Sequence, residues 1–302
     1  MSTPVQASVA RPARNFDLIA FDLDGTVFGT PTSQVISPRV CAAFQAAHEA
    51  GVAVAVASGR PAWMLGQQIP AAPWMDWAIT CNGTRVSGYR RSDLDFAHGF
   101  ARELAEAVLT CLDELGGSAS IHTNRASLME RRHLTHMASD LKAESERAGE
   151  QLPDNPIDKL LSTFGGIAVD SAVEAFRARP DEQLDKVDCK VPTPEAADEL
   201  VERLEALGGV GIARLNAINF ELTSAAASKG DATTELCRRL GIDPARAVAF
   251  GDSGNDLSMT GRELTFVAMG NASLEVKAVA DDITDSVFDD GVATWIEAHL
   301  LA

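Results

Sequence analysis

The sequence has few positive charges for its length. Its 302 residues carry 26 basic side chains against 43 acidic ones, which gives a formal net charge of −17. A surface this acidic repels nucleic-acid phosphates, so we predict no nucleic-acid partner. The chain also lacks an apolar run long enough to cross a bilayer, so we predict no membrane partner.

Cysteines are few and are not arranged as a disulfide or metal framework. The chain has five, widely scattered and without a C-x-x-C pair, which predicts free thiols in a reducing compartment. Residues 1–15 lack the apolar stretch of a secretory signal and are expected to form a disordered extension. Together these features predict a cytoplasmic protein. Nothing in the sequence indicates an oligomeric state.

Two common nucleotide-binding motifs are absent. No G-x-G-x-x-G follows the first expected strand, which disfavours hydride transfer with a dinucleotide. No G-x-x-x-x-G-K-[ST] occurs either, which disfavours a P-loop kinase. What remains is an ordinary globular composition, 46% apolar and 23% charged, in a chain long enough for two domains.

The two ends of the chain alternate between buried strands and helices. The apolar run Leu18 to Phe21 predicts a strand, and Ser37-Pro38 predicts the start of a helix that ends near Gly51. The first part then continues with a strand at 52–57, a helix at 61–68 and a strand at 77–81. After residue 228 the same rhythm predicts a helix at 231–240 and strands at 246–250 and 264–269. Such alternation predicts a parallel α/β sheet.

The middle of the chain has a different pattern, with long helices and short strands. We expect strands at 118–123, 165–169, 186–191 and 212–222, and helices at 133–148, 172–178 and 194–207, with a loop at 153–156. This composition predicts an α+β domain inserted into the α/β core. The predicted division is 16–84 for the first core part, 85–223 for the inserted domain and 224–302 for the second core part.

Polar clusters follow the predicted core strands at their carboxyl ends, where open α/β sheets bind ligands. Asp22 and Asp24 follow the first strand, and two carboxylates so close repel each other unless a cation or a shared proton intervenes. Mg²⁺ suits such a site because it takes oxygen ligands and keeps substrate phosphate in its shell. Other clusters at strand ends are Ser58-Gly59-Arg60, Asn82-Gly83 and Gly251 to Asp256.

These residue types fit phosphoryl transfer. Asp22 can be the nucleophile, and Asp24 can be the acid that protonates the leaving oxygen and the base that activates water. Asp252 suits a third metal carboxylate, and Asp256 could bind the metal's waters or orient Lys229. Phosphate oxygens could be bound by Ser58, the backbone N–H of Gly59, Asn255 and Lys229.

Each cluster alone has a simpler interpretation. D-x-D-G-T and the 58–60 segment could be turns or helix caps, and Lys229-Gly230 could be a solvated helix start. The segment 251–256 could be an acidic or calcium-binding loop, although it lacks the EF-hand spacing. Their occurrence together, in this order, favours a phosphoryl-transfer site.

The ordered motifs DLDGT, ASGR, CNGT, SKG, GDSGNDLSM and AMGNA resemble those of the haloacid dehalogenase (HAD) superfamily, and among its members the Cof-type, or class IIB, phosphatases. The resemblance covers about 16–84 and 225–301. The middle segment matches only in length and position, where such proteins carry a C2 cap.

The resemblance implies a Rossmann-like core, Mg²⁺, and hydrolysis of small phosphate monoesters such as sugar phosphates through an aspartyl-phosphate. It implies Asp22 as nucleophile and Asp24 as acid and base. It places Mg²⁺ on the side chains of Asp22 and Asp252 and on the Asp24 backbone carbonyl, with Asp256 supporting. It places phosphate on Leu23, Ser58, Gly59, Lys229 and Asn255. The implied partner is a small phosphorylated metabolite.

Two alternatives remain open. A sugar phosphomutase would isomerise its substrate without net release of inorganic phosphate. A noncatalytic protein would bind its ligand tightly, and the Asp22→Asn variant would behave like the native chain. Polar residues of the inserted segment, among them His122 and Asn219, are assigned structural roles. His133 and His136 lie three apart on an expected helix and are interpreted as surface residues.

Overall fold

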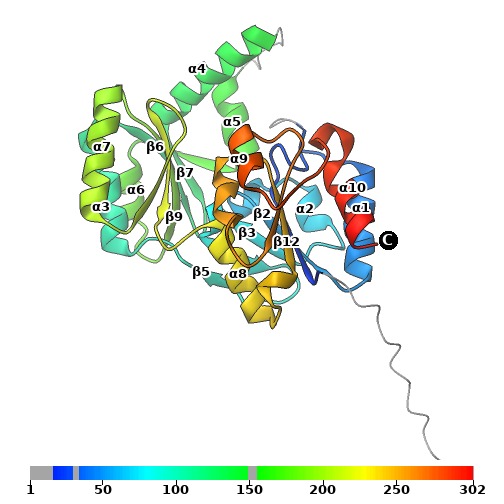
Figure 1. The fold of residues 1–302 in the computed structure, drawn as a ribbon. Coiled ribbons are helices and arrows are strands. Elements are labelled where there is room, and N and C mark those ends of the chain that lie inside the picture. The colour runs from blue at the N-terminus through cyan, green and yellow to red at the C-terminus, as the bar shows by residue number, and fades with distance from the viewer. Residues whose placement is uncertain (1–15, 30–33, 149–154, 302) are drawn as a thin grey trace, which may run out of the picture.

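The protein consists of two β-sheets that carry separate apolar cores (Figure 1). The computed structural model describes residues 16–29, 34–148 and 155–301. The predicted N-terminal extension, residues 1–15, lies outside these ranges. Within the described ranges, no helix is both long and apolar enough to cross a membrane.

The larger sheet has eight strands in the order β14-β13-β12-β1-β2-β3-β4-β5. The six strands from β14 to β3 run parallel, and β4 and β5 add antiparallel strands at one edge. This confirms the predicted α/β class with a parallel sheet. The strand bounds are β1 Leu18–Phe21, β2 Ala53–Ala57, β3 Trp77–Thr80, β4 Arg85–Gly88, β5 Phe96–Ala97, β12 Ala247–Gly251, β13 Thr265–Ala268 and β14 Asp282–Ile283.

Helices cover both faces of this sheet. In Figure 1, α1 (Pro38–Glu49) and α10 (Gly291–His299) lie together on one face, and α8 (Lys229–Leu240) and α9 (Leu274–Val279) lie on the other. The predicted start of α1 is confirmed, because the Ser37 side chain accepts a hydrogen bond from the Val40 amide at 3.2 Å. Gly51, with φ +89°, follows the end of the helix.

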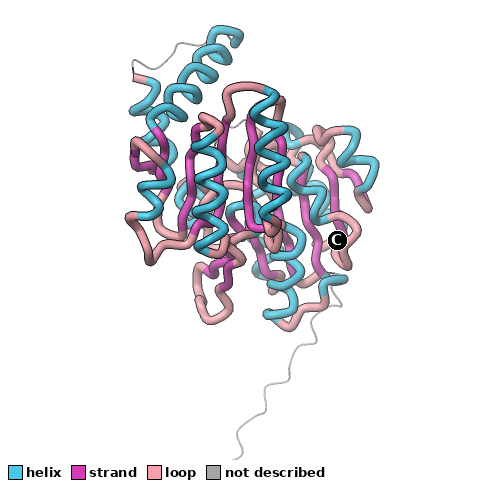
Figure 2. Tube along the Cα trace, turned by 90° about the vertical axis from the view of Figure 1, so that its left-hand side faces the viewer, coloured by secondary structure: helices cyan, strands magenta, loops and turns pink. Residues whose placement is uncertain are grey.

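The smaller sheet has six strands in the order β10-β11-β9-β6-β7-β8. Helices α3, α6 and α7 cover one of its faces, as Figure 2 shows from their side. Helix α4 packs against α5 and projects beyond the sheet. The bounds are β6 Ser118–Thr123, β7 Ser127–Glu130, β8 Gly166–Val169, β9 Leu184–Lys190, β10 Val210–Arg214, β11 Asn219–Ser224, α3 Arg102–Glu114, α4 Arg131–Ala148, α5 Pro156–Phe164, α6 Ala172–Arg177 and α7 Pro194–Leu207.

Several local predictions differ from the structure. The helix expected at 61–68 is a short 3₁₀ turn, Ala62–Met64, followed by a four-residue helix α2 at Gln68–Ala71, because glycine and proline interrupt the segment. The strand expected at 212–222 is a hairpin of β10 and β11. Strand β7 and helix α5 were not predicted, although Asn155 and Pro156 cap and start α5.

The predicted start of the inserted domain at residue 85 falls inside the larger sheet. Strand β4 begins at Arg85 and pairs with β3, and β5 pairs with β4. The smaller sheet begins only at β6 and ends with β11. We refer below to the segment that carries this sheet, from α3 to β11, as the cap, and to the remainder as the core.

Candidate active site

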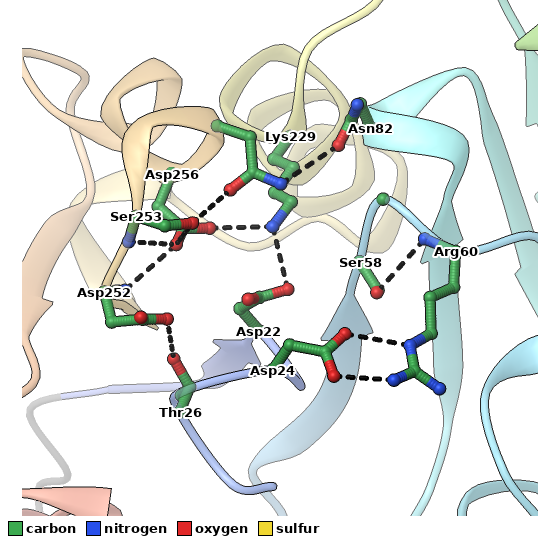
Figure 3. Close-up of polar contacts among 12 residues, drawn as sticks. Asp22, Asp24, Thr26, Ser58, Arg60, Asn82, Lys229, Asp252, Ser253 and Asp256 are labelled. Atoms are coloured by element: carbon green, nitrogen blue, oxygen red, sulfur yellow. Dashed lines mark hydrogen bonds and ion pairs between the residues drawn. The ribbon is translucent and has the colours of Figure 1, made fainter. Parts of the chain in front are cut away.

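Asp22 follows β1, the strand that lies between β2 and β12. Its backbone amide donates to the Phe250 carbonyl at 3.0 Å, which ties the end of β1 to β12. Its side chain is 6% exposed, and Oδ1 accepts from Lys229 Nζ at 2.8 Å (Figure 3). Burial raises the pKa of Asp22 to about 7, although the Lys229 ammonium opposes that shift. The Lys229 ammonium therefore compensates the buried charge of Asp22 only in part.

Lys229 stands at the start of α8, which Ser228 caps by accepting from the Asp231 amide at 3.0 Å. The lysine is fully buried and donates to Asp22 and to Asp256 Oδ1, both at 2.8 Å. Burial lowers its pKa, but the two carboxylates outweigh burial and hold it above the usual value. Lys229 is therefore a permanent cation between two acids.

The loop after β12 supplies two further carboxylates. Asp256 Oδ2 accepts from the amides of Asp252 at 3.0 Å and Ser253 at 3.1 Å, so both of its oxygens have protein donors. Asp252 Oδ1 accepts from Thr26 Oγ1 at 3.2 Å. Burial, followed by the charge of Asp256, raises the pKa of Asp252 to about 6. In the view of Figure 3, Asp252 lies to the left of Asp22 and Asp24 lies to its right.

Gly25 lets the two loops approach each other. Its φ is +81°, and a Cβ there would lie 2.2 Å from Asp252 Oδ2. Any larger residue would therefore push the Asp252 carboxylate away from Asp22. The glycine in D-x-D-G-T is required by this close approach as well as by the turn.

Three acids form a group that fits a hard divalent cation. One carboxylate oxygen from each of Asp22, Asp252 and Asp256 lies within 4.8 Å of the other two. Mg²⁺ prefers oxygen ligands, and its charge would offset the burial that raises the pKa of Asp22 and Asp252. Both carboxylate oxygens of Asp256 already accept hydrogen bonds from the protein, so Asp256 fits a supporting role at the metal site.

The Asp24 side chain is directed away from that group. Its carboxylate forms a two-pronged ion pair with Arg60, with Nε to Oδ2 at 2.8 Å and Nη2 to Oδ1 at 2.6 Å (Figure 3). Arg60 also donates to the Met64 carbonyl at 3.0 Å. Arg60 stands in the ASGR motif, for which a role was predicted only at Ser58 and Gly59. A two-pronged pair of this kind is specific in geometry.

The residues predicted to bind phosphate lie around Asp22. A Leu23 backbone hydrogen bond reaches the Asp22 carboxylate. Ser58 Oγ accepts from the Arg60 amide at 3.2 Å. Asn255 Nδ2 donates to Asn82 Oδ1 at 3.3 Å. Asn82 belongs to the CNGT motif, and no role was predicted for it.

Asn82 also joins the core to the cap. It lies in the left-handed region with φ +55°, directly after Cys81 with φ +51°, so the surrounding contacts must hold a strained turn. Its Nδ2 donates to Glu221 Oε2 of β11 at 2.7 Å. Lys186 of β9 makes a second connection, from Nζ to the Gly59 carbonyl at 3.2 Å.

A cavity of about 420 Å³ lies between the core strand ends and the cap sheet. Among the predicted site residues, it is lined by Asp22, Asp24, Ser58, Gly59 and Asn255, whereas Leu23, Lys229, Asp252 and Asp256 lie outside its lining. From the cap it is lined by Ser120, His122, Met129, His133, His136, Met137, Asp140, Lys186, Asp188, Cys189, Lys190, Leu215, Asn219, Phe220 and Glu221.

The histidines of the cap correct one prediction. His133 was interpreted as a surface residue, but it is only 8% exposed, and both it and His136 face the cavity. The smaller sheet covers one face of α4, and helical spacing of three puts both rings on that face. His122 and Asn219, which were assigned structural roles, also line the cavity.

Comparisons with known proteins agree with this geometry. A family model of haloacid dehalogenase-like hydrolases matches residues 19–296. A 5-amino-6-(5-phospho-D-ribitylamino)uracil phosphatase of Bacillus subtilis is 26% identical over 297 residues, which cover 97% of this chain and all of that protein. An HMP-PP phosphatase of Cronobacter sakazakii is 29% identical over 264 residues, 86% of each chain.

Solved structures share the fold. A haloacid dehalogenase-like hydrolase from B. subtilis is 25% identical with a TM-score of 0.75, over 94% of this chain and 100% of the other. A HAD subclass IIB sugar phosphatase is 21% identical with a TM-score of 0.72, over 93% and 98%. The chain is therefore a phosphatase, and it belongs to the haloacid dehalogenase-like hydrolases.

Proposed function

We propose that this phosphatase is a Mg²⁺-dependent hydrolase of small phosphate monoesters, sugar phosphates or similar metabolites, and that it acts through an aspartyl-phosphate on Asp22. The observation that carries the proposal is the buried Asp22 carboxylate, which lies at the cavity beside Lys229 and within 4.8 Å of carboxylate oxygens of Asp252 and Asp256. We also propose a cytoplasmic location.

Asp22 attacks phosphorus, and the leaving oxygen departs on the opposite side, toward the cap. Lys229 offsets the negative charge beside Asp22 without yielding its proton. Bound Mg²⁺, held by Asp22, the Asp24 backbone carbonyl and Asp252 with support from Asp256, would supply positive charge for the transferring oxygens. The side chain of Ser58, the amides of Leu23 and Gly59, and Asn255 orient those oxygens.

Asp24 donates a proton to the leaving oxygen and later takes one from water. Both oxygens of the Asp24 carboxyl group contact Arg60, so Asp24 must leave this pair before it meets the leaving oxygen. The position of Asp24 in the cavity lining supports this role.

The test is phosphate release from phenyl phosphate and from a panel of sugar phosphates, with Mg²⁺ or with EDTA. We expect Mg²⁺-dependent release by the native chain and none by Asp22→Asn. Absence of release from every substrate would contradict hydrolysis. Isomerised sugar phosphate without inorganic phosphate would instead identify a phosphomutase.

A further inference from the structure

The face of the cap sheet that looks into the cavity is polar. Residues alternate along β6, so Ser118, Ser120 and His122 share one face, whereas Ala119 and Ile121 pack into the apolar core on the other. The neighbouring strand β9 presents Lys186 and other charged residues on the same polar face. Strands β6 and β9 thus contribute hydrogen-bonding groups to the cavity wall opposite Asp22.

Ser120 of this wall has an unpartnered hydroxyl. It is 3% exposed and lines the cavity, yet its Oγ has no hydrogen-bond partner, the only such buried side-chain atom in the described part of the chain. A buried hydroxyl without a partner is costly, and the cost disappears when a ligand atom bonds to it. The hydroxyl therefore points to a ligand group in the cavity.

Two imidazoles that line the same cavity as Ser120 each have a ring nitrogen without a partner among the described residues. Ser118 Oγ lies 3.2 Å from Nδ1 of both His133 and His136, and neither Nε2 has a partner among the described residues. Burial lowers the pKa of His133, which favours a neutral ring that can donate or accept one hydrogen bond. His122 differs, because Ser127 and Asp188 occupy both of its nitrogens.

The positive charges of this wall are already paired. Lys186 Nζ lies 2.9 Å from Asp188 and 2.7 Å from Glu221, and Lys190 lies 3.1 Å from Asp140. A second phosphate would meet these carboxylates and would have to break a pair to gain a cation. An uncharged group would meet the open positions at Ser120 and the imidazoles.

We propose that Ser120, His133 and His136 form a subsite for an uncharged, hydroxyl-bearing leaving group, and that the paired charges around it reject a second phosphate. This inference rests on the proposed function and specifies which phosphate monoesters the enzyme accepts. It makes Ser120 and the two histidines specificity-determining residues that act by direct contact with the leaving group.

The first test compares Ser120→Ala and His136→Phe with the native chain, using sugar and polyol monophosphates and phenyl phosphate. We expect kcat/KM for the hydroxylated esters to fall roughly 3- to 10-fold, which is the loss expected from one or two neutral hydrogen bonds. The kcat/KM for phenyl phosphate should stay within about twofold of the native value. The thermal midpoint of Ser120→Ala should not fall, because an unpartnered hydroxyl is removed. Thr135→Ala, on the same helix as His136 but outside the cavity lining, is the matched control.

The second test measures each monophosphate against the bisphosphate of the same carbon skeleton. We expect the native chain to prefer the monophosphate. Asp140→Asn leaves Lys190 without its carboxylate, and the ratio should move toward the bisphosphate by roughly three- to fivefold, since this partly exposed pair is screened. Asp198→Asn breaks an equivalent cap pair with Arg214 outside the cavity lining and should change nothing.

Equal losses on phenyl phosphate and on hydroxylated esters, no loss on either, or a native chain that prefers bisphosphates would overturn the subsite. Failure of the proposed function has a different signature, namely no phosphate from phenyl phosphate with the native chain. Calorimetric binding of a sugar monophosphate to Asp22→Asn, with and without Ser120→Ala, then tests the subsite without turnover. Weaker binding in the double variant is expected, and equal binding contradicts the proposal.

Discussion

Buried acids lie on both sides of the cavity, and their environments differ. In the core, burial raises the pKa of Asp22 to about 7 and that of Asp252 to about 6, even with Lys229 present. In the cap, burial acts to raise the pKa of Asp188, but Lys186 and His122 hold that pKa below its usual range. Asp188 is thus compensated within the cap, whereas Asp22 and Asp252 are compensated only in part within the core. This difference points to the core as the side that gains from an added cation.

The largest effect should come from removing the nucleophile on the core side. Asp22→Asn keeps the shape of the side chain but cannot form an aspartyl-phosphate, so turnover of phenyl phosphate should fall about 10⁴-fold or more. Steady-state phosphate release measures this, with Asp188→Asn as the matching change on the cap side. A cap variant that loses as much as Asp22→Asn would remove the distinction between the two sides.

Asp24→Asn should come next, with a loss of about 10²- to 10⁴-fold, because proton transfer to and from the substrate is lost. Arg60→Met removes only the partner of Asp24 and should cost less than Asp24→Asn. Turnover of both variants is measured on one aryl ester and one alkyl ester, and the comparison of the two esters shows whether Asp24 acts on the leaving group. Near-native turnover in Asp24→Asn would refute its role.

Lys229→Met should chiefly reduce stability. It leaves Asp22 and Asp256 buried without their shared cation, a change that costs about 3–5 kcal/mol of unfolding free energy. Denaturant unfolding measures the loss. Lys190→Met, on a partly exposed cap pair, should cost less than about 1 kcal/mol, and an equal loss would mean that the two sides do not differ.

The two core carboxylates with raised pKa values should also make the stability of the chain depend on pH. Asp22 and Asp252 bind protons more tightly in the folded chain than in the unfolded one, whose reference value is 3.8. In EDTA, stability should therefore fall as pH rises from about 4 to about 7, because ionising the buried carboxylates costs free energy. Mg²⁺ should restore stability increasingly toward pH 7. The measurement is the thermal midpoint in Mg²⁺ and in EDTA across this pH window. A constant difference between the two midpoints would contradict the prediction.

The smallest effect should come from the contact that joins the two sides. Glu221→Gln keeps an acceptor for Asn82 but removes one of the two carboxylates on Lys186. KM for the preferred ester should rise by about two- to fivefold with kcat nearly unchanged, because the cap meets the core less firmly. A fall in kcat alone would assign Glu221 a role in the reaction itself.

The sequence predicted the core side better than the cap side for a physical reason. Parallel strands bring their carboxyl ends to one edge, so the convergence of Asp22, Lys229, Asp252 and Asp256 could be inferred from motif order alone. Their roles in the reaction stay predictions. The pairing of Asp24 with Arg60 could not be inferred, because Gly25 turns the chain and sets the direction of the side chain.

The cap shows the limit of pattern reasoning. Alternation along β6 indicates two faces, but only the packing of α3, α6 and α7 decides that Ser120 and His122 face the core. His133 was misread because helical spacing does not reveal what a polar face meets. Strands β4 and β5 were not predicted for a related reason, since they are short and extend the larger sheet beyond residue 85.

The most direct measurement is the mass of the chain after rapid acid quench with p-nitrophenyl phosphate. Asp24→Asn is the chain to use, because it should slow hydrolysis of the intermediate while this good leaving group needs little acid help. We expect one added phosphoryl group, on the peptide that contains Asp22, in Mg²⁺ and not in EDTA. Turnover in Mg²⁺ without that adduct, or an adduct on another residue, would contradict phosphoryl transfer to Asp22.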